Sequence, residues 1–269
     1  MTERDRPIGV FDSGIGGLTV MHALMERLPN EGLIYFGDTA RVPYGPKSSE
    51  TVTRFSIENV DLLTGYGVKA VVVACNTATA RALPVLRERF DLPIVGVVGP
   101  GARAGAAATR SGRVGVIGTV GTVSSGAYER ALEAVRDGLH VISRACPLFV
   151  PLAEEGMVDH AATRLVAEEY LAPFRDDGID TLILGCTHYP LLKGVIGGVM
   201  GPGVTLIDSA EETARETAEL LAARGMARED GPPEHRWLVS DLPDQFLRVG
   251  KRFLGGRIGA VEVVTAGSV

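Results

Sequence analysis

Two stretches of this chain, GVKAVVVACNT at residues 67–77 and GIDTLILGCTH at residues 178–188, share one pattern. In each, a glycine precedes an apolar run, and a cysteine follows eight residues after the glycine. Short apolar, β-branched runs bounded by turn residues are typical of buried strands in parallel sheets. The pattern therefore predicts two equivalent strands, each followed by a thiol, in two related halves of an α/β protein.

The similarity extends outward from these strands. IGVFDS at residues 8–13 has a counterpart in VGVIGT at 114–119, and GLIYF at 32–36 corresponds to GLHVI at 138–142. Elements that recur in the same order indicate an internal repeat. We expect two pseudo-symmetric parallel-sheet α/β domains that face each other across a central active-site cleft. The first would contain residues 1–97 plus 209–269, and the second residues 98–208.

Apolar runs alternate with helical periodicity along the rest of the chain. The small-residue segment GPGARAG at 99–105 would join the halves, with a second crossing near Asp208. The segment after Asp208 has no counterpart in the second half, and we expect it to pack back on the first. Strands are expected at 8–11, 33–36, 70–74, 94–97, 114–117, 140–142, 182–184, 204–207 and 237–239. Helices are expected at 18–27, 49–66, 80–89, 128–136, 158–174, 211–224 and 244–253.

Composition excludes several classes of protein. With 269 residues, 45% of them hydrophobic and 22% charged, the chain is typical of a globular protein. The formal net charge is −6 and no basic run occurs, so we expect no nucleic-acid partner. No stretch looks like a signal peptide or a bilayer span, so we expect a cytoplasmic protein with a small-molecule substrate and no membrane partner. A homodimer is compatible with these features.

The cysteines at 75 and 186 are the candidate reactive groups. Ligands bind at the carboxyl ends of parallel strands, so two facing halves would direct both thiols into one cleft. Asn76-Thr77 and Thr187-His188 follow them, and a helix N-terminus at such residues favours a thiolate. A single cysteine is usually a small core residue, but two at equivalent places among polar neighbours favour chemistry. Cys146 lacks this setting and is expected to be structural.

Two other thiol chemistries remain open. One is a redox disulfide between Cys75 and Cys186. The other is a metal held by these two residues and His188, which would need a further ligand. The chain has three cysteines and no CxxC pair, so we expect no metal site.

Acidic residues end the first two expected strands. Asp12 and Ser13 lead into the turn GIGG, whose spacing is not that of a dinucleotide site. We expect these glycines to let backbone amides approach a small anionic ligand, although Asp12 could equally be a helix N-cap. Asp38 precedes Pro-Tyr-Gly at 43–45, a stiff turn that would present Tyr44 and a free amide to a substrate or serve only as a turn.

Five motifs in order along the chain resemble those of glutamate racemases, in the aspartate/glutamate racemase superfamily. These enzymes supply D-glutamate for bacterial peptidoglycan. The motifs are FDSGIGG at 11–17, GDTARVPYG at 37–45, ACNTAT at 74–79, CPLFVPLAE at 146–154 and LGCTHYP at 184–190.

The resemblance implies cofactor-independent interconversion of L- and D-glutamate. Cys75 would remove the α-proton of D-glutamate and Cys186 that of L-glutamate, assisted by Asp12 and His188 respectively. Inverting a stereocentre requires a proton to leave one face and another to arrive at the opposite face, so two acid/base groups suit the reaction. Backbone amides and hydroxyls would stabilise the carbanion. The substrate-contacting positions would be Asp12, Ser13, Tyr44, Gly45, Asn76, Thr77, Thr187 and His188, with Asp38, Glu154, Thr119 and Thr122 around them.

Two rival functions remain at this stage. One is an aspartate or other amino-acid racemase of the same superfamily, and the histidine after Cys-Thr favours glutamate instead. The other is a non-catalytic amino-acid-binding regulator, for which two thiols would not be required.

Overall fold

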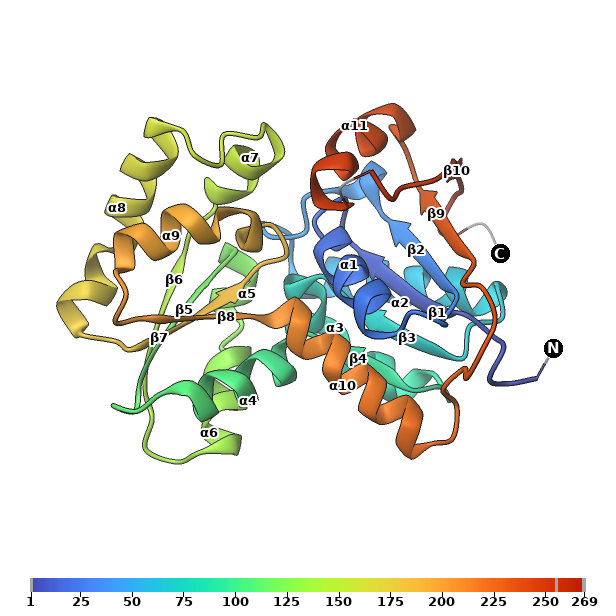
Figure 1. Ribbon diagram of the computed structural model, residues 1–269, viewed down its shortest axis with the longest axis horizontal. Coiled ribbons are helices and arrows are strands. Elements are labelled where there is room, and N and C mark those ends of the chain that lie inside the picture. The colour runs from blue at the N-terminus through green and yellow to red at the C-terminus, as the bar shows by residue number, and fades with distance from the viewer. Residues whose placement is uncertain (1, 255, 268–269) are drawn as a thin grey trace.

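The computed structural model describes residues 2–254 and 256–267, which form two parallel β-sheets with helices on both faces (Figure 1). The first sheet has the strand order β10-β9-β2-β1-β3-β4, and the second has the order β6-β5-β7-β8. The first comprises β1 (Ile8–Asp12), β2 (Leu33–Gly37), β3 (Ala70–Val73), β4 (Ile94–Gly96), β9 (His235–Val239) and β10 (Val261–Val263). The second comprises β5 (Arg113–Gly118), β6 (His140–Ala145), β7 (Thr181–Gly185) and β8 (Thr205–Asp208).

The strand orders confirm the predicted duplication. The series β2-β1-β3-β4 in the first sheet corresponds to β6-β5-β7-β8 in the second, and every strand pair is parallel. Strands β9 and β10 extend the first sheet alone, beyond β2. The predicted fold of two pseudo-symmetric parallel-sheet domains is therefore correct.

Side chains of the first sheet alternate between two cores. Val10 and Val72 belong to one core, whereas Phe11 and Val73 belong to the other. The first core is closed by α1 (Leu18–Arg27), α10 (Ser209–Ala223) and α11 (Pro243–Leu254), and the second by α2 (Ser49–Gly65) and α3 (Asn76–Arg89).

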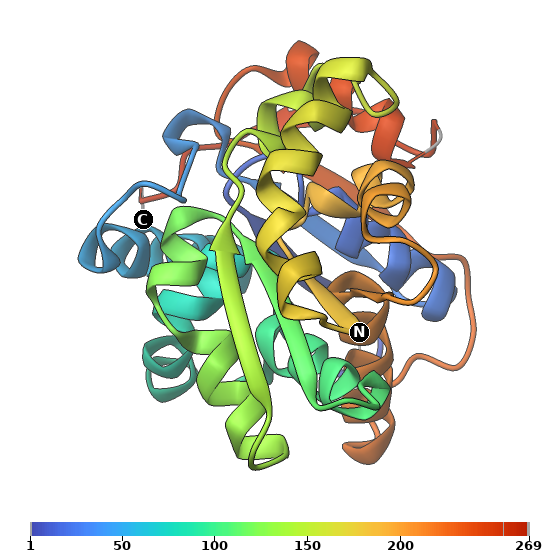
Figure 2. The same cartoon turned by 90° about the vertical axis from the view of Figure 1, so that its left-hand side faces the viewer.

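The second sheet is covered in the same way, as Figure 2 shows from its outer side. Val116 and Ile183 face a core with α4 (Val98–Ala108) and α6 (Ala127–Val135), while Ile117 and Leu184 face the opposite core. That opposite core is built with α7 (Phe149–Glu154), α8 (Ala161–Asp177), the 3-10 helix η2 (Tyr189–Leu192) and α9 (Lys193–Met200). Two short elements, η1 (Thr39–Arg41) and α5 (Val120–Ser124), follow β2 and β5.

The segment expected to join the halves does so as a helix, which the sequence reading did not predict. Residues 99–105 lie inside α4, whose glycines permit close packing. A Cβ on Gly105 would lie 2.7 Å from Ile183 Cδ1, and one on Gly101 would lie 3.2 Å from Ser209 Cβ. Small residues that resemble a linker in sequence thus allow a helix to pack directly on β7 and α10.

Other differences concern short elements and helix ends. Helix α3 begins at Asn76 rather than residue 80, and α8 begins at Ala161 rather than 158 because His160 accepts a hydrogen bond from the Ala162 N–H at 3.1 Å. The sequence reading also missed α5, α7, α9, both 3-10 helices and β10. These elements are too short to show a clear hydrophobic period.

The chain passes between the sheets twice. After β4 it enters α4, which packs against β7 and α6, and after β8 it enters α10, which packs against α1 and α4. The domain boundaries at 97/98 and 208/209 stay predictions. In the described part of the chain, no helix combines the length and apolar character needed to cross a membrane.

Candidate active site

Cys75 and Cys186 follow equivalent strands of the two sheets. Cys75 comes two residues after β3 and is the N-cap of α3, and Cys186 directly follows β7. Each residue is only 5% exposed. Both line one cavity of about 280 Å³. The duplicated topology therefore brings both thiols to the same small space.

Most of the other predicted residues line this cavity too. They come from both halves, because the segments after β1, β2 and β3 meet those after β5, β6 and β7. The predicted residues on its wall are Ser13, Tyr44, Gly45, Asn76, Thr77, Thr119, Glu154, Thr187 and His188.

Three predicted residues lie behind the wall. Asp12 is buried behind Ser13, where its Oδ2 accepts a hydrogen bond from the Gly14 N–H at 2.9 Å. Asp38 is fully buried and accepts a hydrogen bond from the Tyr44 hydroxyl. Thr122 is buried too, with its hydroxyl 3.1 Å from that of Thr119. None of these three is part of the cavity lining, so direct contact of Asp12 with a substrate is not supported by this geometry.

The apolar part of the wall was missed by the sequence reading. It is formed by residues next to predicted ones, within the turn at 42–46, at the start of α5 and within the segment at 147–151. All of them except Pro46 and Val120 lie inside the quoted motifs, which was the available signal. They are Val42, Pro43, Pro46, Val120, Pro147, Val150 and Pro151.

The surroundings of Cys75 disfavour its thiolate. Its thiol donates to Ser13 Oγ at 3.6 Å, and the Ala78 N–H donates to its Sγ at 3.5 Å. Burial, together with the nearby Asp12 carboxylate, raises the pKa of Cys75 to about 12. Burial also raises the pKa of Asp12, whose Oδ1 has no hydrogen-bond partner in the described structure. Cys75 is therefore a neutral thiol near neutral pH.

Cys186 has a cationic neighbour. His188 Nδ1 lies 3.8 Å from Cys186 Sγ, and His188 Nε2 lies 2.8 Å from Glu154 Oε1. Burial lowers the pKa of His188, but the hydrogen bonds and negative charges of Cys186 and Glu154 outweigh it and raise that pKa to about 10. The imidazole is therefore protonated at neutral pH and places a positive charge beside Cys186 Sγ.

The rest of the cavity wall carries neutral hydrogen-bond donors. The Tyr128 hydroxyl donates to Asn76 Oδ1 at 2.7 Å, which leaves the buried Asn76 Nδ2 without a partner in the described structure. The Thr77 and Thr119 hydroxyls, from opposite halves, lie 2.9 Å apart. A buried donor without a partner in the protein is available to a ligand or a water molecule. No Lys or Arg is among the described residues that line the cavity, so His188 is the cationic side chain on a wall that otherwise offers neutral donors.

The glycine-rich turn has a different role from the one expected. A Cβ on Gly16 would lie 2.3 Å from Thr187 Oγ1 and 2.5 Å from His188 Nδ1, and one on Gly17 would lie 2.4 Å from Asp12 Cβ. None of the glycines at 14, 16 and 17 lines the cavity. The turn therefore lets the first half pack closely on the His188 segment of the second, and the approach of its amides to an anionic ligand stays a prediction.

The alternative thiol chemistries find no support in the geometry. Cys75, Cys146 and Cys186 are all free cysteines, and Cys146 is buried in the core of the second sheet. Among residues 2–254 and 256–267, no cluster of three or more His, Cys, Asp or Glu side chains could hold a metal ion.

Comparison with known proteins gives a consistent picture. Residues 8–217 match the family described as Asp/Glu/Hydantoin racemase. The chain is 56% identical over 263 residues to the glutamate racemase of Geobacter metallireducens, covering 97% of each protein. It matches a crystal structure of a glutamate racemase isoform from Bacillus anthracis with a TM-score of 0.95 and 44% identity, covering 97% of this chain and 98% of that one. For the Francisella tularensis glutamate racemase in complex with D-glutamate, the TM-score is 0.92 and the identity 40%, covering 99% of this chain and 100% of that one.

Proposed function

The chain belongs to the Asp/Glu/hydantoin racemase family, and we propose that it is a glutamate racemase with Cys75 and Cys186 as its two proton-transferring groups. The observation that carries this proposal is the pair of thiols that follow equivalent strands and line one small cavity. A relative with 56% identity is a glutamate racemase, and a similar structure holds D-glutamate. The product D-glutamate would serve peptidoglycan synthesis. A cytoplasmic location and a homodimer stay predictions from the sequence.

In the L-to-D direction, the Cys186 thiolate removes the α-proton of L-glutamate. The electron pair of the broken C–H bond moves into the α-carboxylate, giving a planar carbanionic intermediate and a neutral Cys186 thiol. The Cys75 thiol then donates its proton to the opposite face, which gives D-glutamate and a Cys75 thiolate. The D-to-L direction uses the same steps in reverse.

The two thiols have different charged neighbours, which suits this scheme. Cys75, with a pKa of about 12, holds its proton, whereas His188, with a pKa of about 10, supplies a positive charge beside Cys186. Cys75 is thus suited to donate a proton, and a cation lies beside the thiol that would accept one. This agrees with the expectation that Cys186 acts on L-glutamate.

The substrate carboxylates need hydrogen-bond donors, and the cavity offers neutral ones. Asn76 Nδ2 has no partner in the described structure, and the Ser13, Thr77 and Thr187 hydroxyls lie on the same wall. Cys75 is the N-cap of α3, so the first turn of this helix begins at the cavity. The free N–H groups of a helix N-terminus stabilise a negative charge placed there. Donors placed before the reaction stabilise the carbanion without rearranging.

The test is racemisation by the purified protein without any added cofactor. Optical rotation of L-glutamate should decay to zero, while L-aspartate should keep its rotation. Turnover of aspartate alone would assign the protein to the aspartate racemases, and tight binding of glutamate without turnover would make it a regulator.

The thiols themselves are tested by substitution. Cys75→Ser and Cys186→Ser should each lower the racemisation rate by about 10²- to 10⁴-fold, because a hydroxyl is a far weaker acid than a thiol. Cys146→Ala is the matched control, since Cys146 is buried outside the cavity, and it should still racemise glutamate. Near-normal turnover by either serine variant would contradict the two-thiol scheme.

A further inference from the structure

Two adjacent residues at the end of α11 contact the His188–Glu154 pair from the other half of the molecule. The ring of Phe253 meets the imidazole of His188, and the guanidinium of Arg252 donates to the main-chain oxygen of Glu154. We propose that Arg252 and Phe253 are positioning residues that hold this pair in place for proton transfer at Cys186. The proposal rests on the two-thiol function proposed above.

Phe253 fixes the orientation of the imidazole. The two ring centroids lie 6.0 Å apart with an interplanar angle of 87°, an edge-to-face contact between two side chains that are each 7% exposed. Gly16 packs against the same imidazole, near Nδ1 and Cε1. His188 has to aim Nδ1 at Cys186 and Nε2 at Glu154 at the same time, so a small rotation of the ring would weaken both contacts.

Arg252 holds the backbone that carries Glu154. Its Nη1 lies 2.5 Å from the main-chain oxygen of Glu154, the last residue of α7. The same guanidinium lies where a side chain on Gly156 would be, 2.8 Å from an ideal Cβ at that position. Gly156 has a φ of +74°, so a glycine suits this position for its conformation as well as for its lack of a side chain. Arg252 thereby ties the end of α7 to α11.

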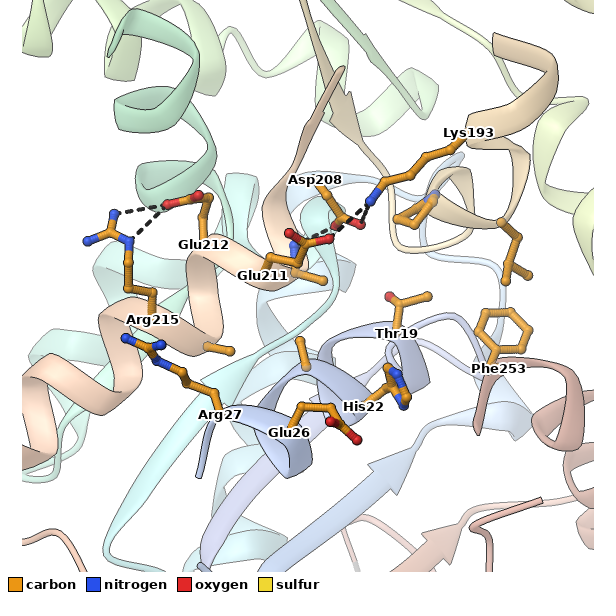
Figure 3. A pocket seen from close by; sticks show the side chains of 15 residues that line it. Thr19, His22, Glu26, Arg27, Lys193, Asp208, Glu211, Glu212, Arg215 and Phe253 are labelled. Carbon is orange, nitrogen blue, oxygen red and sulfur yellow. Dashed lines mark hydrogen bonds and ion pairs between the residues drawn. The ribbon is translucent and has the colours of Figure 1, made fainter. Parts of the chain in front are cut away.

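Phe253 also separates His188 from a solvent-open cleft. This cleft, of about 640 Å³, lies between α1, α10 and η2, and its lining includes Phe253 but not His188. Figure 3 shows Phe253 and Thr19 in the cleft, on the opposite side from Asp208 and Lys193. The Thr19 hydroxyl donates to the main-chain oxygen of Thr187 at 3.0 Å, beside His188. Removing the Phe253 ring would let water from the cleft reach the pair.

This support exists on one side of the reaction only. Helix α11 lies in the C-terminal segment, which has no counterpart in the second half, and it packs on the first sheet. The position equivalent to His188 in the first half is Thr77, a hydroxyl already paired with Thr119. Damage to the α11 contacts should therefore slow the step at Cys186 and spare the step at Cys75.

Primary deuterium isotope effects on kcat/KM separate the two steps. Cys186 removes the label from L-[2-²H]glutamate, and Cys75 removes it from the D enantiomer. In Phe253→Ala the isotope effect should rise with the L enantiomer, because label removal at Cys186 becomes slower. It should fall with the D enantiomer, because label removal at Cys75 is then followed by a slow protonation from Cys186. A smaller fraction of folded enzyme would change neither value.

The rates give a second readout. Because the equilibrium constant between enantiomers is one, kcat/KM should fall by the same factor in both directions, about ten- to hundredfold for a misplaced acid/base group. Phe253→Tyr keeps the ring and should restore the wild-type isotope effects. Arg252→Met should shift them in the same directions as Phe253→Ala. Val249→Ala, in the core one turn earlier on α11, is the matched control and should leave them unchanged.

The outcomes distinguish the two proposals. If the wild-type protein racemises glutamate and Phe253→Ala leaves both isotope effects unchanged, or moves them in the same direction, the positioning role is wrong. A wild-type protein that does not racemise glutamate would overturn the proposed function, and the positioning role with it.

Discussion

Each of the two thiols has a different charge beside it. Cys75 faces the buried carboxyl group of Asp12, whereas Cys186 faces the imidazolium of His188. After burial and Asp12, a negative charge on Cys186 also contributes to the raised pKa of Cys75. Two thiols with different charged neighbours suit a reaction in which one gives a proton while the other takes one.

His188 should give the reaction an alkaline limit. Its raised pKa means that the imidazolium is present below about pH 10 and is lost as the pH rises through that value. Because kcat/KM reports the free enzyme, it should fall above about pH 10 for either enantiomer. His188→Gln should be slower overall, and its kcat/KM should not fall above about pH 10. An unchanged limb in that variant would assign the limit to another group.

The sequence predicted which residues gather at the site better than which of them reach the cavity. Ser13 lines it while the preceding Asp12 does not, and Tyr44 lines it while Asp38 lies behind. Both aspartates end or follow strands, so topology brings them near the cavity. The direction of each side chain depends on packing that no spacing reveals, such as the contact of Gly17 with Asp12.

Elements with a continuous apolar pattern were predictable, and an element whose composition serves distant contacts was not. The strands at 8–12 and 70–73 carry continuous apolar runs that the structure places in the sheet within one residue of the prediction. Helix α4 has the composition of a linker, because glycines at 101 and 105 are required by contacts with α10 and β7 that are distant in sequence. Close packing between elements that are distant in sequence cannot be predicted from a local sequence pattern.

The turn between β1 and α1 offers a test of such a contact. In Gly16→Ala the new Cβ would meet Thr187 Oγ1 at 2.3 Å and His188 Cε1 at 2.5 Å, so the two halves would have to move apart. We expect a loss of about 1–3 kcal/mol in the free energy of unfolding. Racemisation should fall with it, because His188 would be displaced.

The matched control is Gly65→Ala, at the end of α2, where a Cβ would meet nothing within 4 Å. This variant should be neutral or more stable by up to about 1 kcal/mol, since alanine favours a helix over glycine. Urea unfolding of both variants gives the comparison. Equal stability of Gly16→Ala and the wild type would show that the close contact is not required.

At the scale of the whole molecule, the sequence showed both the duplication and the unmatched C-terminal segment, but not the contacts of that segment with the second half. The two cysteine strands match in pattern, so two facing sheets could be expected. The C-terminal segment has no counterpart, and in the structure β9 and β10 extend the first sheet while α11 packs on its core. Through Phe253 and Arg252 it also reaches the second half. The C-terminal segment thus contacts the surroundings of Cys186, and the duplicated halves differ in this respect.

A buried ion pair lies at the amino-terminal ends of strands β2 and β3, at the opposite end of the first sheet from the cavity. Lys69 Nζ lies 2.6 Å from Glu31 Oε2, and the two side chains are 0% and 2% exposed. Lys69 Nζ also donates to the main-chain oxygens of Arg4 at 2.7 Å and Met226 at 2.9 Å, while Glu31 Oε1 accepts from the Arg228 N–H at 2.8 Å. The pair therefore links the N-terminal segment, the first sheet and the chain that returns from α10 to β9.

Loss of Lys69 should destabilise the molecule without changing its chemistry. Lys69→Met leaves Glu31 buried without its cation and should lower the free energy of unfolding by about 3–5 kcal/mol. Adding Glu31→Gln should recover much of this loss, because the second change removes the uncompensated charge. The exposed Lys251→Met is the control and should change stability by less than about 0.5 kcal/mol.

The folded fraction of each variant should racemise glutamate normally, since Lys69 lies before β3 and the cavity lies after it. A double variant no more stable than Lys69→Met would mean that the main-chain contacts of the ammonium, and not the ion pair, hold the three segments together.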